Sequence, residues 1–406
     1  MTYQTHTLPN GLRLIHKPDI SAVAYCGLII NTGSRDEMEQ EQGMAHFIEH
    51  ILFKGTEKRR SGHIINRLEH VGGELNAYTS KEETVVFATV LKEYFERAME
   101  LISDIVLHST FPQKEIDKEI VIILDEISSY KDSPSELIFD DFEEMIFEHH
   151  PIGHNILGKS ELLEKYTTDD AVRFVKRQYH PREMVFFSLG DLNFKQLIRW
   201  AEKYLHTEPS DLQPPQRFSP TTYTPSRMEL EKNTHQVHFM VGNRAYDLYH
   251  PNRIGMYLLN NILGGPGMNS MLNLSLREKH GLVYNVESNY QPFIDTGMWS
   301  VYFGCDTDNA TKCEQLVYAE LQKLRDQPIT HNALKKYKLQ LLGQMAIANE
   351  QKENLALSLG KSFMRYDKID ELEVVRKRID EITAEKLQEI AREVFEPSAL
   401  SVLKYI

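Results

Sequence analysis

The strongest constraint on the fold is a repetition within the 406-residue chain. The segment from Pro209 to Pro225 contains five prolines, the two end residues included, and few apolar residues, a composition typical of a linker between domains. On either side of this stretch, the residue patterns predict a strand, an apolar helix, a pair of strands and two further helices. We therefore predict two similar domains of about 200 residues, 1–208 and 228–406, joined by a linker at 209–227.

Local patterns in the first half predict the individual elements. Apolar and polar residues alternate around Asn10 and Gly11, which predicts a β-hairpin. Residues 74–91 are rich in Thr, Val and Tyr and predict a strand, a turn and a second strand. Helical periodicity predicts two helices, one at about 92–108 and one at about 113–130.

Composition excludes several classes of protein. The hydrophobic content of 41% and charged content of 26% are those of an ordinary globular protein, and the net charge of −13 argues against a nucleic-acid surface. Three scattered cysteines, Cys26, Cys305 and Cys313, are too few for a disulfide framework and favour a reducing compartment. The amino terminus lacks the pattern of a secretory signal, and no apolar run is long enough for a membrane span. We expect a cytoplasmic protein with neither nucleic acid nor membrane as a partner.

A His-x-x-Glu-His sequence stands in the predicted apolar helix of the first half. Because a helix advances about 100° per residue, His46, Glu49 and His50 share one face. Two imidazoles four residues apart can bind one zinc ion, and a carboxylate beside them can deprotonate a water molecule. The order is the inverse of the commoner metalloprotease motif. The alternative is a helix whose polar face merely carries histidines.

The corresponding helix of the second half lacks these residues. Aligning residues 45–52 with 256–263 places Tyr257, Asn260 and Asn261 at the positions of the two histidines and the glutamate. The apolar positions are kept. The sequence therefore predicts chemistry in the first half, and a shaping or binding role for the second.

Two glutamates lie seven residues apart on the predicted helix at 113–130. Isoleucines at 116, 120, 123 and 127 form an apolar stripe, and neighbouring apolar residues extend it, so we predict a largely buried helix. Glu119 and Glu126 adjoin this stripe, and a carboxylate in such a place usually has a partner. That partner is either a metal ion or a Lys or Arg side chain.

At this point the chain resembles the pitrilysin-type metallopeptidases (the inverzincins of family M16), in particular the short subgroup with the mitochondrial processing peptidase and bacterial single-chain relatives. The resemblance covers essentially the whole chain and rests on the segments 43–56, 72–84, 118–134, 151–158 and 275–284. It implies an α+β fold of two similar domains, each with a mixed, mostly antiparallel sheet packed with helices, which together form a half-chamber.

The resemblance also implies the roles of individual residues. In this family the motif helix is completed by a glutamate about 76 residues further on, which here is Glu126. His46, His50 and Glu126 would then hold one Zn²⁺ per subunit, with Glu49 as the general base. Glu119 matches the companion glutamate that precedes the third ligand and would orient a histidine.

A substrate site follows from the same resemblance. Relatives bind peptide as an added strand beside the segment that matches Asn76, Ala77 and Tyr78, and supply an arginine and a tyrosine that match Arg277 and Tyr284. Taken alone, these would be a turn residue at Asn76, an exposed helix charge at Arg277 and a core aromatic at Tyr284. The loop before this arginine is less uniformly glycine-rich here than in relatives.

Together these residues predict a zinc endopeptidase or oligopeptidase that hydrolyses peptides or unfolded segments inside a closed, dimeric chamber. Because relatives enclose the chamber with two such chains, the resemblance implies a homodimer. The competing interpretation is a non-catalytic scaffold or heteromer partner of the same fold. A purely structural zinc site is disfavoured because three ligands beside a glutamate form an open site.

Overall fold

The computed structural model describes residues 3–207, 216–232 and 234–406, so the predicted linker at 209–227 lies partly outside the described residues. By its contacts the chain forms two compact units. The first unit comprises Met1–Ile127, His154–Arg217 and Ile347–Asp370. The second unit comprises Ser128–Gly153, Phe218–Ala346 and Glu371–Ile406.

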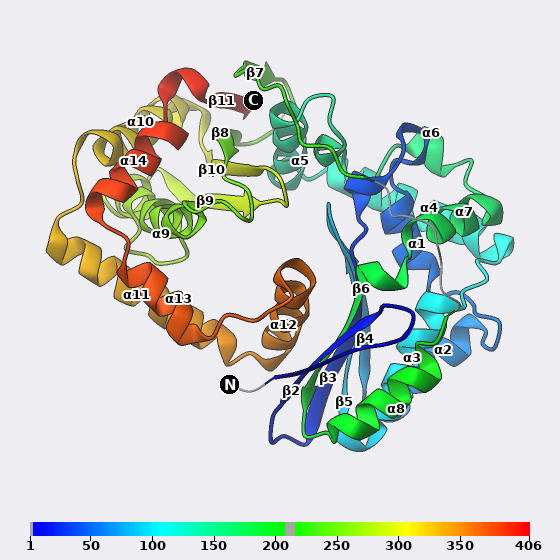
Figure 1. Ribbon diagram of the computed structural model, residues 1–406. Helices are drawn as coiled ribbons and strands as arrows, with labels where there is room; N and C mark the ends of the chain where they lie inside the picture. The colour runs from blue at the N-terminus through cyan, green and yellow to red at the C-terminus, as the bar shows by residue number, and fades with distance from the viewer. Residues whose placement is uncertain (1–2, 208–215, 233) are drawn as a thin grey trace. The chain divides into compact units, whose positions relative to one another are not determined.

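The first unit is built on a six-stranded sheet with the order β1-β2-β6-β3-β5-β4 (Figure 1). Strands β2 and β6 pair in parallel, and the other neighbours pair antiparallel. The predicted hairpin around Asn10 and Gly11 is confirmed as β1 and β2, and the predicted strand pair at 74–91 as β4 and β5. The strands are β1 (Gln4–Thr7), β2 (Arg13–Pro18), β3 (Val23–Ile30), β4 (Glu74–Thr79), β5 (Thr84–Leu91) and β6 (Met184–Gly190).

The second unit repeats this arrangement in a five-stranded sheet with the order β7-β11-β8-β10-β9. Its first and last strands, β7 and β11, pair in parallel, as β2 and β6 do, and the remaining pairs are antiparallel. Two α+β domains with mixed, mostly antiparallel sheets are thereby confirmed, whereas the half-chamber stays a prediction. The strands are β7 (Arg227–Leu230), β8 (Val237–Ala245), β9 (Val283–Pro292), β10 (Gly297–Cys305) and β11 (Ser401–Tyr405).

Helices cover the sheets in both units (Figure 1). In the first unit they are α1 (Met44–Ile51), α2 (Ser61–Glu69), α3 (Phe95–Leu107), α4 (Gln113–Lys131), α6 (Ser160–Leu163), α7 (Thr168–Gln178), α8 (Phe194–Tyr204) and α12 (Lys352–Tyr366). In the second unit they are α5 (Pro134–Ile146), α9 (Arg253–Gly264), α10 (Ala310–Asp326), α11 (His331–Asn349), α13 (Leu372–Asp380) and α14 (Ala384–Val394). The last residues of α4 and α11 belong to the other unit by contacts.

Two helices belong to the unit that their position in the sequence does not suggest. Helix α12 follows the second sheet's strands in sequence, yet its Leu359 and Phe363 pack on Ile29 and Phe187 of the first sheet. Helix α5 precedes the linker, yet its Phe142 belongs to the apolar core of the second unit. Each of the two sequence halves thus contributes one helix, α5 or α12, to the other unit. The contiguous domain boundaries predicted from the sequence do not include this exchange, because the pattern of an amphipathic helix does not show which sheet it covers.

Helix α4 is less buried than predicted. Ile116, Glu119 and Ile123 are buried on one face, but Val121 is 58% exposed and Ile122 is 49% exposed. The prediction of a largely buried helix was therefore wrong. The buried residues, Ile116, Glu119, Ile123 and Ile127, recur every three or four positions, and Val121 and Ile122 lie outside this face.

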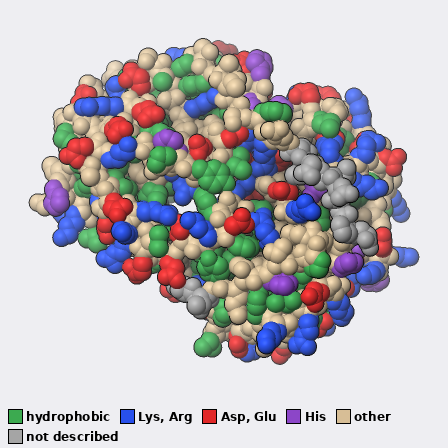
Figure 2. Space-filling model, viewed as in Figure 1, with side chains coloured by type: hydrophobic (Ala, Val, Ile, Leu, Met, Phe, Trp, Pro, Cys, Tyr) green, Lys and Arg blue, Asp and Glu red, His purple; other side chains and the backbone are tan. Residues whose placement is uncertain are grey.

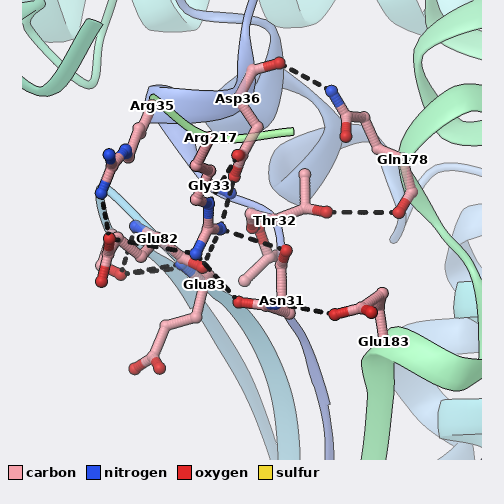
Figure 3. Close-up of polar contacts among 12 residues, drawn as sticks. Asn31, Thr32, Gly33, Arg35, Asp36, Glu82, Glu83, Gln178, Glu183 and Arg217 are labelled. Atoms are coloured by element: carbon pink, nitrogen blue, oxygen red, sulfur yellow. Dashed lines mark hydrogen bonds and ion pairs between the residues drawn. The ribbon is translucent and has the colours of Figure 1, made fainter. Parts of the chain in front are cut away.

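A buried cluster of charged side chains closes one end of the first unit's sheet (Figure 3). Arg217 donates two parallel hydrogen bonds of 2.7 Å to the carboxylate of Asp36, and a third, of 2.9 Å, to the backbone carbonyl of Glu82. Glu82 also accepts from Arg35 at 2.6 Å. The side chains of Arg217 and Asp36 are 12% and 6% exposed. Arg217, which lies within the predicted linker at 209–227, is thus bonded to Asp36 and to the turn between β4 and β5.

We predict that Arg217→Met lowers the free energy of unfolding of the first unit by about 3–5 kcal/mol, because it leaves the buried Asp36 carboxylate without its paired cation. Denaturant unfolding of the purified variant measures this loss. The matched control is Arg173→Met, since Arg173 is 67% exposed and pairs only within its own helix, with Asp170, in the described contacts. A similar loss in both variants would contradict the prediction.

Candidate metal centre

Helix α1, which carries the His-x-x-Glu-His motif, begins at a backbone-to-backbone contact. Gly43 precedes the helix with a φ of 97°, and an added Cβ there would lie 2.7 Å from the carbonyl oxygen of Leu157. A Cβ on Gly158 would lie 2.2 Å from the carbonyl oxygen of Gln42. Both positions require glycine because the two chain segments touch there.

A buried carboxylate holds the same end of the helix. Glu37 accepts hydrogen bonds from the backbone N–H groups of Gly43, at 2.9 Å, and Ala45, at 2.8 Å. Burial raises the pKa of Glu37 well above its usual value, although these two bonds act in the opposite direction. The hydroxyl of Tyr166 donates to the carbonyl of Gln42 at 2.9 Å. The N-terminus of α1 is therefore fixed on several sides.

Three possible metal ligands converge between α1 and α4. One ligand atom each from His46, His50 and Glu126 lies within 4.8 Å of the other two. The Glu126 carboxylate oxygen is 3.9 Å from Nε2 of His46 and 3.8 Å from Nε2 of His50. The structure thus brings together the three residues that the sequence predicts as ligands, although they are up to 80 residues apart.

These residues fit a zinc ion. Two imidazole nitrogens and one carboxylate oxygen are the donor set of an open, catalytic zinc site. Zinc–ligand bonds of about 2.0–2.2 Å in a tetrahedron place neighbouring donors about 3.3 Å apart, roughly half an ångström closer than the ion-free distances of 3.8 and 3.9 Å. Burial, and next the neighbouring His50, lower the pKa of His46 to about 4, so this imidazole is neutral at pH 7 and able to coordinate.

Glu119 lies behind the ligands and contacts one of them. Its Oε1 is 2.9 Å from Nδ1 of His50, and its Oε2 is 2.7 Å from Nζ of Lys54. Burial acts to raise the pKa of Glu119, but the hydrogen bonds from His50 and Lys54 hold it below its usual value. Of the alternatives for this residue, a lysine partner is present. Sequence reasoning missed Lys54 because it lies beyond the last residue of α1, where helical spacing does not predict which way a side chain points.

Glu49 lies on the same helix as the two histidines and faces the edge of the sheet. Burial raises its pKa, while hydrogen bonds with Thr79 at the end of β4 oppose the shift. Thr79 also donates from its hydroxyl to the carbonyl of Ala45 at 3.5 Å. Sequence reasoning did not single out Thr79, which joins α1 to the edge strand.

The predicted peptide-binding residues lie on that edge strand. Strand β4 pairs only with β5 among the described strands, and Asn76, Ala77 and Tyr78 stand opposite Phe87, Val86 and Val85. Tyr78 turns toward α12, where the Lys361 ammonium lies 4.9 Å from its ring centroid. Burial raises the pKa of Tyr78 to about 12.

Arg277 and Tyr284 belong to the second unit and lie close to each other there. The guanidinium of Arg277 is 5.7 Å from the ring centroid of Tyr284, a cation–π contact. Tyr284 is 87% exposed at the start of β9, so the alternative of a core aromatic is excluded. Arg277 stands in a π-helical turn, Asn273–Glu278, a form that is frequent at functional sites.

The second unit's counterpart of α1 is α9, and its polar residues are engaged in hydrogen bonds. Asn260 donates to the carbonyl of Ser288 at 3.0 Å, and Asn261 donates to the side chain of Gln344 at 2.7 Å. Among the described residues, the only group of at least three possible ligands is the one in the first unit.

Comparisons with known proteins agree with this architecture. Residues 14–160 match the family model described as insulinase (peptidase family M16), and residues 165–341 match the model described as the peptidase M16 inactive domain. An uncharacterized zinc protease of Streptomyces coelicolor is 30% identical over 402 residues, which are 97% of this chain and 87% of that protein. The chain belongs to peptidase family M16. An uncharacterized zinc protease of Bacillus subtilis is similar to this M16 chain, with 29% identity over 98% of the chain and 97% of the relative.

Solved structures share the fold of this M16 chain. A protease from Helicobacter pylori aligns with a TM-score of 0.90 at 20% identity, over 100% of this chain and 99% of that one. A structure described as the peptidase M16 inactive domain, from Pseudomonas fluorescens, also gives 0.90 at 20% identity, over 100% and 98%. Within the described ranges of the M16 chain, no helix is both long and apolar enough to span a membrane.

We predict that Gly158→Ala displaces the start of α1. The alanine would clash with the backbone of Gln42 and would hold an unfavourable φ of +77°. The matched control is Gly72→Ala, since Gly72 has a φ of +70° but nothing within 4 Å of the added Cβ. The control should lose about 1–2 kcal/mol of stability from backbone strain, and Gly158→Ala a further ~1–3 kcal/mol from the clash. Denaturant unfolding compares the two, and equal losses would refute the role of this contact.

Proposed function

We propose that this chain is a zinc-dependent endopeptidase or oligopeptidase that hydrolyses peptides or unfolded segments. One observation carries the proposal: His46, His50 and Glu126 converge within 4.8 Å, with Glu49 on the same helix. The neutral imidazole of His46 and the donor set suit zinc. The zinc proteases among its M16 relatives support the assignment.

Bound at these three residues, Zn²⁺ supplies Lewis-acid chemistry, because it polarises a carbonyl and lowers the pKa of a coordinated water. Glu49 takes the proton of the attacking water and delivers it to the leaving amine, a role that contributes about 10²–10⁴-fold to the rate. Its raised pKa suits a group that must both accept and release a proton near neutral pH. Glu119 keeps the His50 ring oriented through Nδ1.

Strand β4 is the proposed binding site for the peptide. An edge strand has unpaired backbone N–H and C=O groups, and a peptide can add to it as a further strand, whatever its side chains. The contact of Thr79 with both Glu49 and Ala45 supports this choice, since it joins the strand to the catalytic helix. Asn76, Ala77 and Tyr78 would lie along the bound peptide.

The proposed active form is a homodimer that encloses a chamber. Arg277 and Tyr284 of the partner subunit would then contact the peptide bound in the first subunit. The exposure of Tyr284 and its pairing with Arg277 support a binding role for this pair.

Figure 2 shows acidic and basic side chains interspersed over the face in view, with no extended basic surface there that would suit nucleic acid.

Two glutamine variants separate the proposed base from the proposed ligand. Glu49→Gln should abolish cleavage of a quenched fluorescent peptide, since no general base remains, yet keep one zinc per subunit by metal analysis. Glu126→Gln should lower the zinc content, because a carboxylate ligand is lost. Digestion of a mixed peptide library, followed by mass spectrometry, compares the native protein with Glu49→Gln and reports the accepted lengths. Near-full activity of Glu49→Gln would exclude the proposed base, and a native protein without metal or cleavage would favour a non-catalytic scaffold.

Mixing two inactive variants tests the dimer. Glu49→Gln lacks the base and Arg277→Ala lacks the proposed substrate contact, so each homodimer should be inactive or impaired. If Arg277 acts across subunits, half of the randomly mixed dimers hold one complete site, and about a quarter of native activity returns. The control mixes Glu49→Gln with Glu126→Gln, whose defects lie in the same unit and should not complement. If the first mixture recovers no activity, Arg277 either acts on the site of its own subunit or has no part in the reaction.

A further inference from the structure

We propose that Lys54 is a positioning residue for the metal centre, which fixes the zinc ligand His50 through Glu119 and thereby sets how tightly zinc is held. This inference rests on the proposed zinc function and adds a residue to it. Nothing in the His-x-x-Glu-His motif or its companion glutamates includes a lysine.

Two contacts connect the side chains of Lys54, Glu119 and His50 in that order. Lys54 donates from Nζ to Oε2 of Glu119 at 2.7 Å, and the other oxygen, Oε1, is 2.9 Å from Nδ1 of His50. The side chain of Glu119 is 5% exposed, against 25% for Lys54 and 23% for His50. A buried carboxylate is costly unless its oxygens are paired, and here each oxygen has one partner.

The same contacts determine which nitrogen of His50 can coordinate. With Nδ1 donating to Glu119, the lone pair of the neutral ring is on Nε2, which is the atom 3.8 Å from Glu126. Lys54 holds the carboxylate in place by its second oxygen. Without this cation, the Glu119 side chain has one partner fewer and is free to turn away from the ring.

The two histidines differ in this respect. Nδ1 of His46 is buried and has no hydrogen-bond partner in the described part of the chain. Among the described residues, therefore, only the ring of His50, and not that of His46, is held at Nδ1 by a side chain, that of Glu119. Lys54 is the second partner of Glu119, so we expect its removal to lower the affinity for zinc.

Backbone contacts fix where Lys54 stands. Its own N–H donates to the carbonyl of Ile51 at 3.1 Å, in the turn that ends α1. The next residue, Gly55, accepts from the N–H of Thr110 at 3.1 Å, just before α4 begins. The end of α1 is thus bonded to the segment just before α4, the helix that carries Glu119. These backbone hydrogen bonds hold Lys54 close to Glu119.

Competition with a chromophoric zinc chelator tests the proposal on the whole protein. Lys54→Met should raise the zinc dissociation constant about 10-fold or more, the usual effect of losing a group behind a metal ligand. Lys54→Arg should restore most of the affinity, since it returns a cation. Glu119→Gln should raise the zinc dissociation constant by about 10–100-fold. Adding Lys54→Met to Glu119→Gln should raise it little further, since both changes break the same chain of contacts.

The control is Lys118→Met, because Lys118 adjoins Glu119 in sequence but pairs with Glu115 and is 57% exposed. Its zinc dissociation constant should not change. Thermal unfolding of each metal-free variant reports folding separately, and Lys54→Gln replaces Lys54→Met if the latter does not fold. An unchanged zinc affinity in the folded Lys54 variant would overturn the inference alone. A native protein that binds no zinc would overturn the proposed function together with it.

Discussion

The position of helix α1 is the constraint on which the site depends. The helix has eight residues, too few to be stable alone, and it supplies two proposed ligands and the proposed base. Its place is fixed by the close approach of Gly43 and Gly158, by the carboxylate of Glu37 and by an apolar face that includes Phe47, which is fully buried. A site that is rigid before the metal binds needs little rearrangement to bind it.

Buried carboxylates connect the elements of the first unit. Glu37 ties the start of α1, Glu119 ties its end to α4, and Asp36, in the segment after β3, binds Arg217 of the predicted linker. The side chain of each is less than 10% exposed and has donors for its oxygens. Such contacts cost desolvation and add little net stability, but they permit few alternative arrangements, since an unpaired carboxylate would be strongly unfavourable.

Local patterns carried the parts of the prediction that succeeded. The helical positions of His46 and His50, the strand pair of β4 and β5 and the two helices α3 and α4 could be read from local sequence patterns, and Glu126 from the family resemblance. Contacts between distant segments could not be read in this way. The exchange of α5 and α12 depends on which sheet offers a matching apolar face. The pairing of Lys54 with Glu119 depends on how the end of α1 meets α4.

The second unit shows why the fold alone does not give the chemistry. Helix α9 keeps the position and apolar face of α1, but its polar residues are bound to neighbours: Asn260 to Ser288 on β9, and Asn261 to Gln344 on α11. Tyr257, at the position of His46, packs edge-on against Tyr290 with ring centroids 4.9 Å apart. Tyr257 and Asn261 correspond to His46 and His50, and Asn260 corresponds to Glu49, so restoring the motif in α9 would remove all three contacts. Since these residues of α9 are bonded to their own neighbours, we assign the second unit a role through its surface, where we propose that the exposed pair of Arg277 and Tyr284 contacts the peptide.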